Sequence, residues 1–165
     1  MIHPTNSKKD GFLASIPTAS IDSKDDTLTK RCKFNFSYMD FSQSAGQKFE
    51  DWTHDQLSKL LDKIYAYCKE PLKYWENQKI GGKTHSVLEI YGGFPRISDF
   101  KHPAHVPHQA MWARFRLESS VRLVGFVLPP EYDKKQHIGT GLYFDCNTFY
   151  AVFLDADHRF YKAKK

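Results

Sequence analysis

Residues 111–128 contain two runs of alternating apolar and polar residues, separated by a short polar break. This pattern is typical of a β-hairpin. With a three-residue loop at 118–120, one face carries only apolar or small cross-strand pairs, which are Leu117–Val121, Phe115–Leu123, Ala113–Gly125 and Met111–Val127. A two-residue loop would mix the two faces, so burial should select the three-residue register. The sequence therefore predicts strands near 109–117 and 121–128 whose apolar face lies against a core.

The opposite face of this hairpin gathers three arginines beside an aromatic pair. Its cross-strand pairs are Arg116–Arg122, Arg114–Val124 and Trp112–Phe126. Like charges directly opposite each other are destabilising, and we therefore expect an anion to bind between the arginines. The alternative interpretation is that they form the solvated outer face of an amphipathic hairpin. In both interpretations the arginines are expected to be exposed, so that replacing Arg122 by alanine should leave the fold intact.

The rest of the chain predicts an α+β fold. Strands are expected at Cys32–Tyr38, at Val87–Tyr91 and at Thr148–Leu154, which is the most apolar and is expected in the centre of the sheet. The spacing of apolar residues predicts a helix over 49–68, capped by Asp51 or Thr53, and a short one over 72–78 after Pro71. We expect an antiparallel sheet with one or two N-terminal helices on one face, which leaves the other face for the arginines.

Composition and charge indicate a single domain with a flexible arm. The 165 residues include 13 Phe, 9 Tyr and 3 Trp, enough for an ordinary core. Residues 1–30 are polar, with balanced charge and only a brief apolar patch at 11–16, and we expect a flexible arm there, followed by one domain over 31–165. The net charge of +5 lies entirely in that domain, which is compatible with an anionic partner.

Several kinds of site are not expected. The three cysteines are widely spaced without a CxxC pair, which favours buried thiols in a reducing cytosol. The histidines of the run 102–108 (His102, His105 and His108) have an appealing spacing, but Pro103 and Pro107 forbid a regular helix there, and we expect no metal. Glycine-rich phosphate loops and the GxSxG motif are absent, so we expect no cofactor.

The N-terminus has no apolar signal region, and no apolar run approaches the ~18 residues of a membrane span. We therefore expect a soluble, cytoplasmic protein that does not bind a membrane.

The remaining polar residues suit RNA cleavage without a metal. That reaction needs a base for the 2′-hydroxyl, cations on the phosphate, an acid for the leaving oxygen, and a surface that stacks on a base. Arginine binds phosphate through two parallel charge-assisted hydrogen bonds. The arginines, together with Glu118, His158 and Tyr161, supply these groups.

Two stretches resemble the RelE/ParE-like toxin superfamily. Residues 112–124 (WARFRLESSVRLV) are similar to its "W-x-R-r-i…h-R-L-v-y" hairpin, and residues 149–161 (FYAVFLDADHRFY) to its last strand and His/Tyr-bearing tail. The resemblance implies that Arg122 contacts the scissile phosphate with Arg114 or Arg116 as its companion. It further implies that His158 and Tyr161 act in acid/base chemistry or stacking, with Glu118 as a base. Four more residues are expected to bind nucleic acid: Trp112, Phe126, Arg159 and Lys162.

The chain is nearly twice the usual length of such toxins, with insertions at 92–108 and 129–147. These could wall the site, dock a partner, or mark a relative without nuclease activity. The leading hypothesis is a metal-independent endoribonuclease that cuts mRNA at the ribosome and is neutralised by an antitoxin. The alternative is a non-catalytic basic module that binds nucleic acid or an acidic protein, and a third is a structural domain whose arginines pair with nearby acids.

Overall fold

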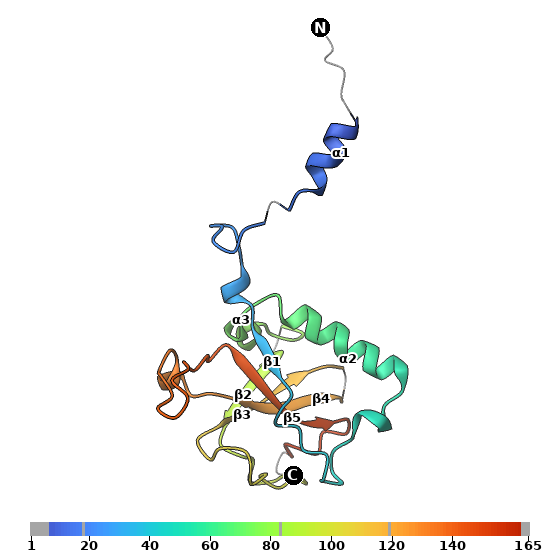
Figure 1. The fold of residues 1–165 in the computed structure, drawn as a ribbon. Coiled ribbons are helices and arrows are strands. Elements are labelled where there is room, and N and C mark those ends of the chain that lie inside the picture. The colour runs from blue at the N-terminus through green and yellow to red at the C-terminus, as the bar shows by residue number, and fades with distance from the viewer. Residues whose placement is uncertain (1–6, 18, 83, 119, 163–165) are drawn as a thin grey trace.

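The computed structural model describes residues 7–162 except 18, 83 and 119. Its main elements are α1 (Ser7–Ser15), β1 (Lys33–Asn35), α2 (His54–Tyr67), α3 (Leu72–Asn77), β2 (Leu88–Gly92), β3 (Met111–Arg116), β4 (Arg122–Val127) and β5 (Thr148–Asp155). Short 3-10 turns occur at Leu28–Lys30, Phe49–Asp51 and Pro130–Tyr132. The expected α+β architecture is confirmed: α2 and α3 lie on one side of a single sheet, and the loop between β2 and β3 lies on the other (Figure 1).

The five strands are arranged in the order β1-β5-β4-β3-β2. Strands β2 to β5 form an antiparallel meander, but β1 runs parallel to β5, with Lys33 beside Thr148. The prediction of a purely antiparallel sheet was therefore wrong. Parallel neighbours need a long crossover connection, and both helices and the meander lie between these two strands. Strand β5 has a neighbour on each side, while β4 occupies the middle.

The predicted hairpin register is confirmed. Phe115 pairs with Leu123, Ala113 with Gly125, and Arg116 with Arg122. The apolar face packs under the helices in a core that includes Leu60 and Tyr67 of α2. Gly125 is required in this core, because a Cβ there would lie 2.1 Å from the carbonyl oxygen of Tyr150.

Helix α2 begins directly after its N-cap residue, Thr53. Thr53 Oγ1 accepts a hydrogen bond from the Gln56 backbone N–H at 3.3 Å, and Gln56 Oε1 accepts one from the Thr53 N–H at 2.9 Å. This capping box satisfies two backbone donors at the first turn. Of the two caps considered, Thr53 is therefore the observed one. Pro71 is the N-cap residue of α3, since its backbone is extended and it precedes the first helical residue.

A second core lies on the opposite face of the sheet. It includes Trp112, Phe126, Phe153, Phe100 and Phe160. Phe100 comes from the 92–108 insertion and Phe160 from the segment after β5, so both fold back over the sheet. The alternation of the strands suggests a solvated face, but this part of the face is buried in a second core.

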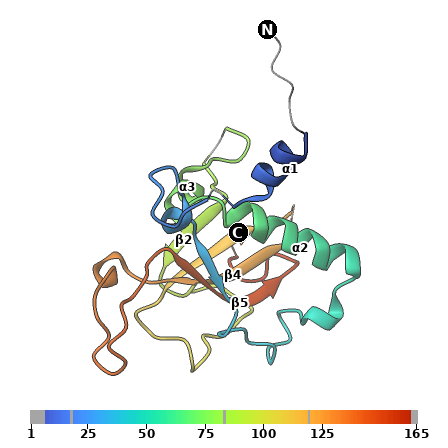
Figure 2. The same cartoon turned by 45° about the horizontal axis from the view of Figure 1, so that its top comes forward.

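The N-terminal arm stands apart from the two cores. Its helix α1, which the sequence pattern does not predict, has no buried residues and points away from the sheet in both views (Figures 1 and 2). Residues 1–6 of the expected arm lie outside the described residues. No helix in the part of the chain that the structure describes is both long and apolar enough to cross a membrane.

Candidate active site

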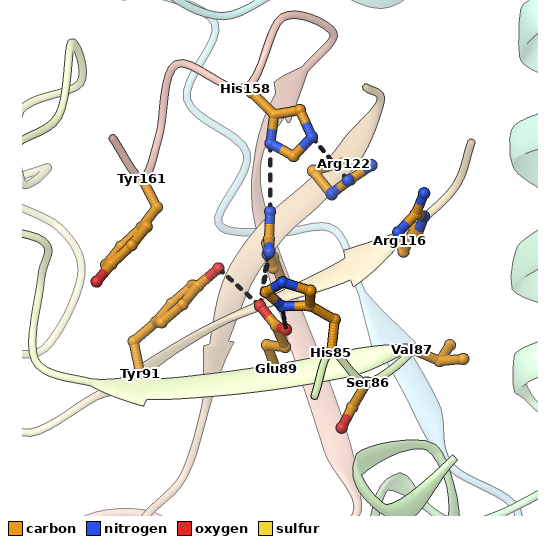
Figure 3. A pocket seen from close by; sticks show the side chains of 10 residues that line it. His85, Ser86, Val87, Glu89, Tyr91, Arg116, Arg122, His158 and Tyr161 are labelled. Atoms are coloured by element: carbon orange, nitrogen blue, oxygen red, sulfur yellow. Dashed lines mark hydrogen bonds and ion pairs between the residues drawn. The ribbon is translucent and has the colours of Figure 1, made fainter. Parts of the chain in front are cut away.

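A half-open cavity of about 560 Å³ lies on the sheet face opposite α2. Its polar lining consists of Arg114, Arg116, Arg122, His85, His158, Glu89, Tyr91, Tyr161 and Ser86. These side chains come from strands β2, β3 and β4, from the segment just before β2 and from the segment after β5 (Figure 3). The cavity therefore brings together the three predicted arginines, His158 and Tyr161.

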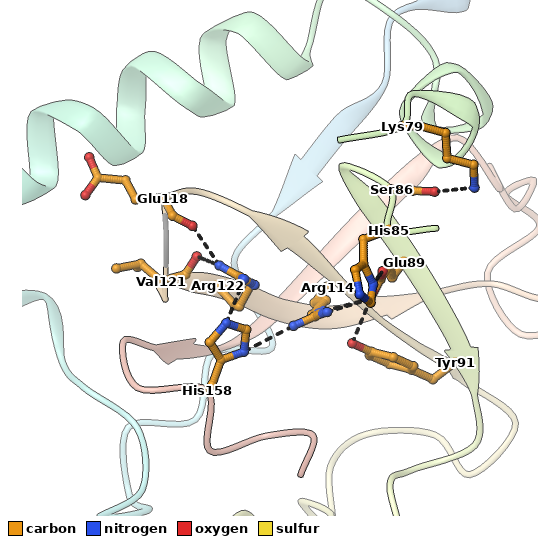
Figure 4. A network of polar contacts seen from close by, with 10 residues as sticks. All are labelled: Lys79, His85, Ser86, Glu89, Tyr91, Arg114, Glu118, Val121, Arg122 and His158. Carbon is orange, nitrogen blue, oxygen red and sulfur yellow. Dashed lines mark hydrogen bonds and ion pairs between the residues drawn. The ribbon is translucent and has the colours of Figure 1, made fainter. Parts of the chain in front are cut away.

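Arg122 is buried, although the sequence pattern predicts an exposed side chain. It is only 4% exposed, and its Nη1 donates to the backbone carbonyl oxygens of Glu118 and Val121, each at 2.8 Å (Figure 4). The guanidinium thus lies beneath the chain at the end of the hairpin. The expectation that Arg122→Ala leaves the fold intact was therefore based on a wrong placement, because the substitution removes a buried side chain and both of these hydrogen bonds.

Burial and the neighbouring positive charges both affect the pKa of Arg122. Burial, followed by the charges of Arg114 and Arg116, lowers this pKa to about 10. The guanidinium remains protonated at neutral pH, so three cations line one cavity. An anion bound there would relieve their mutual repulsion.

Glu89 is the carboxylate of the cavity, and the sequence interpretation missed it. Its Oε2 accepts hydrogen bonds from Arg114 Nη2 at 2.6 Å and from Tyr91 Oη at 3.3 Å, while Oε1 lies 2.8 Å from His85 Nδ1. Burial alone would raise the pKa of Glu89, but the hydrogen bonds from Arg114 and His85 outweigh it, and the pKa is lowered. Glu89 is therefore ionised at neutral pH. The available signal was a single carboxylate in the apolar run 87–91, which the register places opposite Arg114.

His158 enters the cavity from the turn after β5. Asp155, which is buried, accepts hydrogen bonds from the backbone N–H groups of Arg159 and Phe160, each at 2.9 Å, and so holds this turn. His158 has a left-handed backbone, with φ of 57°. The sequence interpretation treated Asp155 only as part of a turn, so it missed the role of this residue as well as that of Glu89.

The His158 ring bridges two arginines. Its Nε2 lies 2.7 Å from Arg122 Nη2, and its Nδ1 lies 3.3 Å from Arg114 Nη1 (Figure 4). A guanidinium only donates hydrogen bonds and a neutral imidazole has one acceptor nitrogen, so the ring can accept from only one of the two arginines. The shorter contact makes Nε2 the candidate acceptor and places a ring nitrogen beside two cations.

Tyr161 forms one wall of the cavity together with Tyr91. The two rings stack with centroids 4.8 Å apart and planes 2° from parallel. In Figure 3 this pair lies on the side of the cavity away from Arg116. Half of Tyr161 is exposed, which leaves it accessible to a ligand.

Glu118, the predicted base, is not in the cavity. Its carboxylate lies 3.7 Å from Lys59 Nζ on α2, and only its backbone oxygen reaches Arg122 (Figure 4). Strand alternation would place Glu118 on the same face as Arg114 and Arg116. Glu118 lies beyond the end of β3, however, and its side chain turns toward α2. The carboxylate beside the arginines is Glu89 instead.

The four expected nucleic-acid-binding residues also lie outside the cavity. Trp112 and Phe126 are each 1% exposed in the second core, where no base can stack on them. Arg159 Nε lies 3.1 Å from Asp99, and Lys162 pairs with the same carboxylate. The tail after His158 is thus attached to the 92–108 insertion.

The histidine run has local structural partners. His102 Nδ1 lies 2.9 Å from the Pro103 carbonyl oxygen, and His105 Nε2 lies 3.0 Å from that of Tyr38. Within the described ranges, no group of three or more His, Cys, Asp or Glu residues is placed to hold a metal ion.

In comparisons with protein-family models, curated proteins and solved structures, nothing matches this chain. The resemblance to the RelE/ParE-like superfamily therefore rests on the residues of the hairpin and of the C-terminal segment.

Proposed function

We propose that the protein is a toxin-like, metal-independent endoribonuclease of the RelE type that acts on mRNA at the ribosome in the cytoplasm and is neutralised by an antitoxin. The observation that carries this proposal is the convergence of three arginines, a histidine and a tyrosine stack on one open cavity. The sequence resemblance assigns the same arginines and the same histidine to this chemistry.

In the proposed reaction, the guanidinium groups of Arg116 and Arg122 bind the scissile phosphate and stabilise its growing negative charge. The 2′-oxygen forms a bond to phosphorus as the bond from phosphorus to the 5′-oxygen breaks. His158 takes the proton of the 2′-hydroxyl and returns it to the leaving 5′-oxygen. Glu89 holds Arg114 in place, and Tyr161 stacks on a base.

Arg116 gives the cleanest test. Its side chain lines the cavity, and among the described residues no carboxylate forms an ion pair with it, so Arg116→Ala should not disturb the fold. Induced expression of the wild type should arrest growth and accelerate mRNA decay, and Arg116→Ala should lower the cleavage rate about 10²–10³-fold. Lys63→Ala, on the exposed side of α2, is the control for the loss of one positive charge.

His158→Asn tests the proton transfer, because asparagine tolerates a left-handed backbone better than alanine does. Cleavage by the purified variant with ribosomes should fall about 10²–10³-fold relative to the wild type. Full activity of His158→Asn would exclude the assigned role.

A second candidate is a non-catalytic basic module that binds nucleic acid or an acidic protein. It is favoured by the contacts that Arg114 makes with Glu89 and Arg122 with backbone carbonyls, since such a network also stabilises a structure without catalysis. RNA binding with a steep salt dependence, without cleavage in the presence or absence of ribosomes, would support this candidate.

A further inference from the structure

A second cavity of about 460 Å³ adjoins the first. Tyr91 and Tyr161, the stacked pair, line both cavities. The rest of its lining includes Phe94, Arg96, Ile97 and Lys162. The tyrosine pair is therefore a partition with a cavity on either side.

The 92–108 insertion builds this second cavity and fixes it to the tail that carries His158 and Tyr161. The Asp99 N–H donates to the Arg159 carbonyl oxygen at 3.0 Å, and the Lys162 N–H donates to that of Ile97 at 3.2 Å. The Asp99 carboxylate also pairs with both of these basic side chains. The second cavity and the candidate active site therefore share one backbone framework, so that their relative position is set before any ligand binds.

The chemistry of the second cavity suits a nucleotide. Tyr161 and Phe94 present aromatic surface, and a base of any type can stack on such surface. Arg96 is exposed, and among the described residues no carboxylate pairs with it, in contrast to Lys162, which is paired with Asp99. An unpaired guanidinium beside aromatic rings is available for a phosphate.

We propose that the second cavity is a subsite for the nucleotide adjacent to the scissile phosphate, and that the substrate is therefore a single strand. One phosphate of the RNA strand binds to the arginines of the first cavity. The RNA strand then crosses the tyrosine pair, and Arg96 binds the next phosphate. A base paired in a duplex could not reach the tyrosine faces, which excludes double-stranded substrates. This inference rests on the proposed function for the identity of the ligand as RNA, but not on catalysis.

Binding of oligonucleotides tests the subsite separately from cleavage. The probe is a fluorescent 12-nucleotide RNA, 2′-O-methylated so that it resists cleavage, and the readout is fluorescence anisotropy over a range of salt concentrations. Arg96→Ala should weaken binding about fivefold to tenfold and reduce the salt slope by about 0.7, the value for one phosphate contact on a single strand. Lys63→Ala should change neither quantity. A nucleoside monophosphate fills only the first cavity. It should therefore bind the wild type and both variants with the same affinity, as measured by its displacement of the probe.

Three results would decide against the subsite. If Arg96→Ala binds like Lys63→Ala, or if the wild type does not bind the probe, the subsite does not exist, even if the protein cleaves mRNA. If the duplex form of the probe or a polyglutamate peptide binds more tightly and depends on Arg96, the cavity serves a different ligand. Conversely, Arg96-dependent binding by a protein that cuts nothing would retain the subsite and exclude the nuclease.

Discussion

The sheet face opposite α2 has two halves, one closed and one open to a cavity, although both halves belong to the same two strands, β3 and β4. In the closed half, Trp112 is buried under side chains from the 92–108 insertion and the C-terminal segment, and Phe126 is buried against Tyr38 and Tyr150. In the open half, Arg114 and Arg116 line a cavity. Alternation places all four side chains on one face, so it assigns a side chain to a face but does not say whether that face meets solvent.

The two halves differ because of what comes to lie over them. Phe94 packs edge-on to Trp112 with ring centroids 4.9 Å apart, and Phe160 lies 5.5 Å from the same indole. Apolar rings can seal an aromatic pair, whereas sealing three guanidinium groups without anions would cost a large desolvation energy. The insertion therefore closes one half and contributes no lining residue to the cavity of the other.

The largest expected effect comes from the closed half. Trp112→Ala should lower the free energy of unfolding by about 3–5 kcal/mol, because it removes a large buried aromatic side chain from the second core. Chemical denaturation provides the measurement. If the variant keeps its stability and instead loses RNA binding, Trp112 belongs to the site and the distinction between the halves is wrong.

Arg122 lies at the boundary between the two halves. Its side chain is buried, but it also contributes to the lining of the cavity. Arg122→Ala should lower the free energy of unfolding by about 1–3 kcal/mol, because it removes a buried side chain and its hydrogen bonds to the Glu118 and Val121 carbonyl oxygens. Arg116→Ala should change it by less than about 0.5 kcal/mol, as expected for a residue without such contacts. Parallel denaturation curves test both, and equal stability losses in the two variants would remove the contrast.

The ion pair in the open half should make stability depend on pH. The pKa of Glu89 in the folded protein lies below its ordinary value of 4.5, so its contribution is fully present above about pH 4.5 and is lost as the pH falls through the lower folded pKa. Glu89→Gln should therefore be less stable than the wild type by about 1 kcal/mol at neutral pH. The difference between the two should shrink below pH 4.5 in urea titrations at several pH values. A constant difference would show that the carboxylate charge is not what stabilises this half.

Deleting residues 1–28 should have the smallest effect, because α1 buries none of its residues against either half. The melting temperature measured by circular dichroism should remain nearly unchanged. A fall of many degrees would show that the apolar patch at 11–16 packs on the domain.

The local sequence pattern by itself determined the hairpin register and the face of each arginine, and it offered Thr53 as one of two possible caps for a helix predicted over 49–68 and observed over His54–Tyr67. Period-two alternation and the Thr53 cap depend on residues close together in the chain, and these relations survive in any tertiary arrangement. The pattern also indicated which residue types could bind phosphate.

Only the tertiary structure decided which of those side chains meet one another. The burial of Trp112, the replacement of Glu118 by Glu89 as the carboxylate of the cavity, and the parallel pairing of β1 with β5 all depend on contacts between distant segments. Period-two alternation carries no information about which loop covers a face or which strand becomes a neighbour. Those outcomes are set by long-range packing, in which the 92–108 insertion and the C-terminal segment bury aromatic rings together and leave the arginines around an open cavity.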